Sequence, residues 1–103
     1  NLDNPFRGWD GAEHIPAAAA KKAAGQYRKT RSQLMKLATQ PSENAQALEA
    51  VAAYTQTFNK MRFIETEERD EIYMALCGIL DALPDNTLPK DALIEKFEEL
   101  RDF

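Results

Sequence analysis

The feature that most constrains this 103-residue chain is a helical spacing of apolar side chains that recurs in four separate segments. Apolar residues return every three to four positions in about residues 16–38, 42–61, 66–83 and 89–101. The alternation typical of a β-strand is found nowhere. Because short connections place successive helices as antiparallel neighbours, the sequence predicts an all-α fold. We expect residues 1–103 to form a single antiparallel four-helix bundle-like domain.

Residues 1–15 do not follow this spacing and are expected to form an irregular N-terminal arm. Asn4-Pro5 and two glycines interrupt any period, while Phe6 and Trp9 supply two large apolar side chains. Two aromatic rings in a segment without its own core are expected to pack into a groove of the helical domain. We therefore predict that Trp9 is at least half buried.

The inward helix faces also predict a core and two local features. Thr66 is the expected N-cap of the third helix. Gly25, inside the first helix, indicates close approach of another helix, because an interior glycine otherwise costs stability. The predicted core comprises ten side chains: Tyr27, Leu34, Leu48, Val51, Phe58, Ile72, Leu76, Ile79, Leu93 and Phe97.

The net charge of −4 conceals a strong asymmetry along the chain. Residues 1–64 carry nine Lys or Arg and five Asp or Glu, whereas residues 65–103 carry four bases and twelve acids. The densest acidic stretch is 65–71, where five of seven residues are acidic. Charge is therefore the feature of the surface that says most about partners.

The third helix presents a candidate partner-binding face opposite its apolar side. Met74 lies on this face among acidic residues, and charge can steer a basic partner while a methionine adapts to an apolar pocket. A second interpretation is that the acids near the helix start complement the helix dipole and that Met74 is one of many scattered exposed apolar residues. The candidate residues are Glu67, Asp70, Glu71, Met74 and Asp81.

The first helix shows a basic face instead. Such a stripe could follow a phosphate backbone, but it has no interleaved aromatic residues, and a pI near 5.0 is far from that of a typical nucleic-acid module. A solvated face balanced by acids elsewhere in the fold or across a dimer is the favoured interpretation, with nucleic acid, anionic lipid or an acidic protein as alternatives. Its residues are Lys21, Lys22, Arg28, Lys29 and Lys36.

No catalytic or cofactor-binding pattern is recognisable. His14 is the only histidine and is expected to be a solitary surface residue, while Cys77, the only cysteine, is expected to act as a small apolar side chain near the core. No glycine-rich phosphate loop or calcium-loop spacing is present. We therefore predict a non-enzymatic protein without metal or cofactor. No segment is apolar enough to cross a bilayer. No signal peptide is visible, but the sequence begins at Asn1 rather than at a methionine, so removal of a leader stays open.

The stretch Phe58-Asn59-Lys60-Met61-Arg62-Phe63-Ile64-Glu65-Thr66-Glu67-Glu68-Arg69-Asp70 resembles small all-helical bacterial immunity proteins, which are encoded beside secreted or contact-dependent toxins and neutralise them. The resemblance implies a cytoplasmic inhibitor that binds a cognate toxin, often a basic nuclease, through an acidic face. Two other classes stay open: a structural or adaptor bundle that acts by oligomerisation, for instance as a homodimer, and a nucleic-acid-binding regulator that uses the basic first helix.

Overall fold

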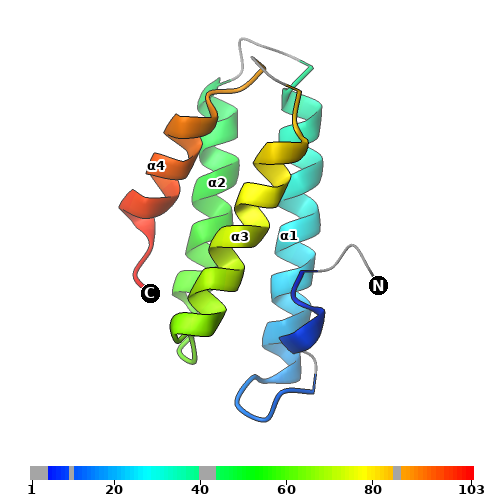
Figure 1. Ribbon diagram of the computed structural model, residues 1–103, viewed down its shortest axis with the longest axis vertical. Helices are drawn as coiled ribbons and strands as arrows, with labels where there is room; N and C mark the ends of the chain where they lie inside the picture. Colours follow the sequence, from blue (N-terminus) through cyan, green and yellow to red (C-terminus); the bar gives the residue numbers. More distant parts are fainter. Residues whose placement is uncertain (1–4, 10, 40–43, 85–86) are drawn as a thin grey trace.

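The computed structural model describes residues 5–9, 11–39, 44–84 and 87–103, and in these residues the only regular elements are helices. Successive α-helices run in opposite directions, with α3 lying across the front of α1 and α2 (Figure 1). The predicted all-α, bundle-like class is therefore confirmed. The elements are the short 3-10 helix η1 (Arg7–Trp9) and the α-helices α1 (Ala17–Leu37), α2 (Asn44–Asn59), α3 (Thr66–Ala82) and α4 (Lys90–Leu100).

The helix boundaries lie within two residues of the predicted ones, with one change of capping residue. The predicted start of the second helix at Ser42 lies outside the described residues. Glu65, rather than Thr66, is the N-cap of α3. Its backbone N–H donates to a side-chain oxygen of Glu68 at 3.0 Å. The Glu65 side chain accepts in turn from the Glu68 backbone N–H, so the two residues form a capping box. With Glu65 as the cap, α3 begins at Thr66, one residue earlier than a Thr66 cap would place its start.

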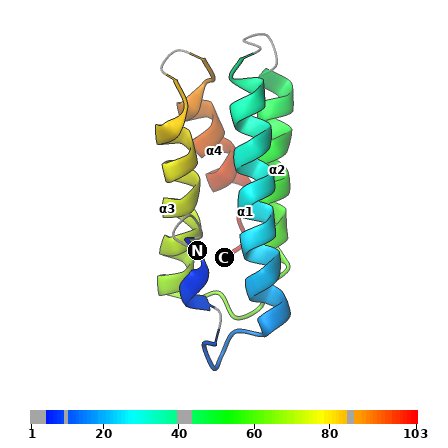
Figure 2. The same ribbon diagram turned by 90° about the vertical axis from the view of Figure 1, so that its right-hand side faces the viewer.

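The N-terminal arm completes the core instead of lying free. Figure 2 shows η1 between α3 and the lower half of α1. Phe6 and Trp9 are only 1% and 2% exposed. The Trp9 ring meets Phe6 at a centroid distance of 4.9 Å and Phe63 at 5.5 Å, and Phe6 lies 5.3 Å from Phe58. The predicted burial of Trp9 is confirmed, and the arm contributes two of the largest side chains in the core.

The helical core follows the predicted faces with two exceptions. Eight of the ten predicted core side chains are buried, whereas Tyr27 and Leu48 are only partly buried. The face of α2 that packs into the core is centred on Ala47, Val51 and Tyr54, so Leu48 lies at the edge of this buried face. Tyr27 is at the border with the arm, where its ring meets Phe6 at 6.3 Å.

A buried hydrogen bond joins α2 to α3 inside this core. The Tyr54 hydroxyl donates to the Ile72 carbonyl at 2.6 Å. Burial raises the pKa of Tyr54 well above its ordinary value, with smaller contributions from Tyr27 and Cys77.

The prediction that another helix approaches closely at Gly25 is wrong, because a Cβ at this position would meet nothing within 4 Å.

Candidate protein-binding surface

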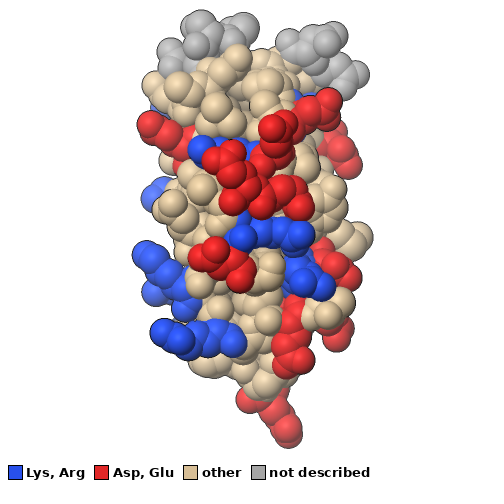
Figure 3. All heavy atoms as spheres, turned by 90° about the vertical axis from the view of Figure 1, so that its left-hand side faces the viewer, with Lys and Arg blue, Asp and Glu red and all other residues tan. Residues whose placement is uncertain are grey.

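Four of the five predicted partner-binding residues lie exposed along one side of α3. They are Glu67, Asp70, Met74 and Asp81, and we call them the acidic stripe. Their spacing of three, four and seven residues keeps them on one helix face. Met74 is 68% exposed, the highest value among the large apolar side chains that the structure describes. Figure 3 views the neighbouring side of the molecule, where acidic groups extend over α4 and basic groups gather at the lower left.

Glu71, the fifth predicted residue, has a different role. It is partly buried and accepts a hydrogen bond from Trp9 Nε1 at 3.0 Å. The helical spacing places Glu71 beside the stripe, but the arm covers that side of α3. Because Trp9 and Glu71 are 62 residues apart, periodicity within the helix could not reveal this contact. Glu71 therefore serves to fasten the arm, and it is not part of the acidic stripe.

A second contact fastens the arm one helical turn earlier. His14 Nε2 donates to Glu68 Oε2 at 3.2 Å, so the expectation of a solitary histidine is wrong. Glu68 is 5% exposed. Burial alone would raise the pKa of Glu68, but the hydrogen bonds from the Glu65 backbone and from His14 together outweigh burial and lower it below its ordinary value.

This lowered pKa predicts a pH-dependent stability. We expect Glu68→Gln to lower the free energy of unfolding by about 1 kcal/mol at neutral pH, because glutamine keeps an oxygen acceptor for the Glu65 N–H but lacks the negative charge that strengthens the hydrogen bonds from Glu65 and His14. The unfolded chain binds the proton more tightly than the folded one. The extra stability of the wild type over Glu68→Gln is therefore fully present at pH values above the ordinary carboxyl pKa of about 4.5. It is lost as the pH falls through the lower pKa that Glu68 has in the folded state. Urea unfolding measured from neutral pH down to about 3 tests this.

The control for this experiment is Glu67→Gln, which removes an exposed carboxylate from the same helical turn. An identical loss of wild-type advantage with falling pH in both variants would contradict the assignment to Glu68.

Gly78 lies on the exposed side of α3, four residues after Met74 and three before Asp81. A Cβ at this position would meet nothing within 4 Å. An interior glycine destabilises a helix by about 0.5–1 kcal/mol relative to alanine. Contacts within the described chain therefore do not explain this residue, and it leaves a low point on the surface between the Met74 and Asp81 side chains.

The five basic residues predicted on the first helix are all exposed on α1.

One of these residues, Lys22, also lines a groove of about 710 Å³ between the start of α1 and the end of α2. Lys60, Met61, Arg62 and Phe63, in the connection that follows α2, line its other side. Sequence reasoning did not find this groove. The alternation of basic and apolar residues at 60–63 was the one available signal, and its partner surface lies about 40 residues earlier in the chain.

Cys77, on α3, is partly buried, as expected for a small apolar side chain. It interacts with Tyr73 one turn earlier, and the hydrogen bond with its thiol raises the pKa of Tyr73. Among the described residues, no cluster of three or more His, Cys, Asp or Glu side chains has the arrangement of a metal site. None of the described helices is both long and apolar enough to cross a membrane.

Comparison of the chain with protein-family models, with curated proteins and with solved structures found no match.

Proposed function

We propose that this chain is a non-catalytic inhibitor that binds a basic protein through the acidic stripe, in the manner of an immunity protein that neutralises a bacterial toxin. The observation that carries the proposal is Met74, which stands 68% exposed between acidic residues on α3. An exposed methionine is a flexible apolar anchor, and the surrounding carboxylates attract a basic surface. A nuclease must attract phosphates, so an acidic helix can occupy the same site.

Gly78 is a second, independent observation that supports the same surface. The helix stability that this glycine costs is not offset by any close contact within the described chain. A partner that approaches α3 closely beside Met74 would supply one. The acidic balance of residues 65–103, eight negative charges in excess, extends the attraction beyond the stripe itself.

The test is binding to the product of the neighbouring gene, with charge reversal of Glu67 and Asp70. Rim charges act mainly on association. We therefore expect Glu67→Lys with Asp70→Lys to slow association about tenfold at low salt and to flatten its salt dependence. Stopped-flow kinetics over a range of salt concentrations measures both. The matched control is Glu95→Lys with Glu99→Lys, an equal charge change on exposed positions of α4.

The apolar centre of the stripe should act on dissociation instead. We expect Met74→Ala to raise the dissociation rate by an amount equivalent to about 1–2 kcal/mol if Met74 is the anchor. Gly78→Gln should weaken binding while the fold is retained, because open space surrounds this position. The matched variant is Gly25→Gln on α1, where a Cβ also meets nothing within 4 Å.

Unchanged affinity in both the charge-reversal and the Met74 variants would remove the acidic stripe from the interface. A persistent dimer without any partner would instead favour the oligomerising adaptor. Salt-sensitive retention on DNA or RNA that requires Lys21 and Arg28 would favour the nucleic-acid-binding regulator.

A further inference from the structure

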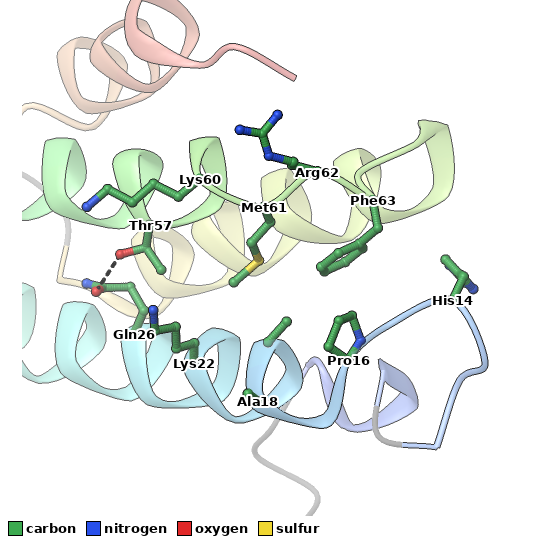
Figure 4. Close-up of a pocket in the computed structure, with 11 residues that line it drawn as sticks. His14, Pro16, Ala18, Lys22, Gln26, Thr57, Lys60, Met61, Arg62 and Phe63 are labelled. Carbon is green, nitrogen blue, oxygen red and sulfur yellow. Dashed lines mark hydrogen bonds between the residues drawn. The ribbon is translucent and has the colours of Figure 1, made fainter.

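The groove between α1 and α2 combines an apolar centre with a basic end. Met61 and Phe63 point from the connection after α2 toward the first turns of α1, where Phe63 faces Pro16, whereas Arg62 points the opposite way (Figure 4). Met61, Phe63 and Ala19 also pack against the core from this side. The groove therefore has an apolar floor supported by the core.

Polar groups are concentrated at one end of the groove. The Thr57 hydroxyl donates to Gln26 Oε1 at 2.9 Å, joining the two walls, and Lys22 and Lys60 lie on either side of this bridge (Figure 4). No carboxylate is among the lining residues. In addition, α1 has neither an acid in its first turn nor a side-chain cap. This N-terminus lies beside Pro16, at the opposite end of the groove from the Thr57–Gln26 bridge, so its partial positive charge does not add to that of the two lysines.

From this arrangement we infer a binding site for a small anionic amphiphile, a molecule with one negatively charged head and an apolar body. The head contacts Lys22 and Lys60 beside the Thr57–Gln26 bridge, and the body covers Met61 and Phe63. The volume of about 710 Å³ falls in the range of small-molecule sites, which combine a mostly apolar lining with a few polar groups. This site is separate from the acidic stripe and does not depend on the proposed inhibitor function.

The experiment titrates the protein with octanoate, which has a carboxylate head and an apolar tail, and with two partial probes. Acetate supplies the head alone, and 1-octanol supplies the tail alone. Trp9 is the only tryptophan and its ring lies 5.5 Å from that of Phe63, so its fluorescence reports occupancy of the groove. We expect saturable binding of octanoate and affinities at least about tenfold weaker for acetate and 1-octanol.

Variants locate the site and separate charge from nonspecific attraction. Lys22→Gln with Lys60→Gln should weaken octanoate binding about tenfold, because both contacts to the head are lost. The matched control, Lys29→Gln with Lys36→Gln, removes two exposed charges from α1 outside this groove and should change affinity less than about twofold. Amide shifts in NMR spectra should centre on residues 16–26 and 57–63.

Three results would overturn the inference. They are equal binding of octanoate and 1-octanol, equal weakening by the two lysine pairs, and amide shifts centred outside the groove. Binding to anionic phospholipid vesicles without saturable binding of octanoate would also overturn it, because the site would then recognise a membrane surface rather than a free molecule.

Discussion

Replacing Trp9 by alanine is expected to lower the free energy of unfolding by about 3–5 kcal/mol. The ring is 2% exposed and meets Phe6, Phe58 and Phe63 at centroid distances of 4.9, 6.0 and 5.5 Å. Its removal opens a large cavity where the arm closes the bundle. It also leaves the partly buried Glu71 carboxylate without its indole donor. Urea unfolding followed by the helical circular dichroism signal measures the loss.

Trp9→Phe separates the two parts of this effect. It retains most of the apolar volume but removes the N–H that donates to Glu71, so the expected loss is about 1–2 kcal/mol. A loss below about 1 kcal/mol for Trp9→Ala would show that the arm is not part of the cooperative unit. If Trp9→Phe lowered the free energy of unfolding as much as Trp9→Ala, the hydrogen bond to Glu71 rather than the packing of the ring would account for the effect.

The helices and the burial of the arm could be predicted from the sequence because both depend on local information. The i, i+3, i+4 spacing that places Ile72, Leu76 and Ile79 on one face of α3 is a property of that segment alone. Two aromatic rings in a segment without a core of its own have few alternatives to docking. No partner residue had to be identified for either prediction.

Two of the misassigned residues, Glu71 and His14, share one cause, which is that their environment is set by distant segments. Glu71 lies on the outward side of an isolated helix, but the arm covers it in the folded chain. His14 is solitary in sequence, but the fold places it 3.2 Å from Glu68, 54 residues away. The groove likewise requires that α1 and the end of α2 lie side by side. The acidic stripe was accessible to prediction because its four residues lie within α3.

Leu76→Ala is the second substitution with a large expected effect, a loss of about 2–5 kcal/mol in the free energy of unfolding. Leu76 is completely buried at the inner face of α3. A loss of this size is a large part of the stability of about 5–15 kcal/mol that is usual for a domain. Thermal unfolding should therefore show a midpoint lower by more than about 10 °C.

Met74→Ala is the control for this substitution, because it also shortens an apolar side chain on α3. Met74 is 68% exposed, so its truncation should change stability by less than about 0.5 kcal/mol. Comparable losses for the two variants would contradict the assigned inner and outer faces of α3. A large difference would show that Met74 is not needed for the fold, so that a faster dissociation caused by Met74→Ala reports on the partner contact alone.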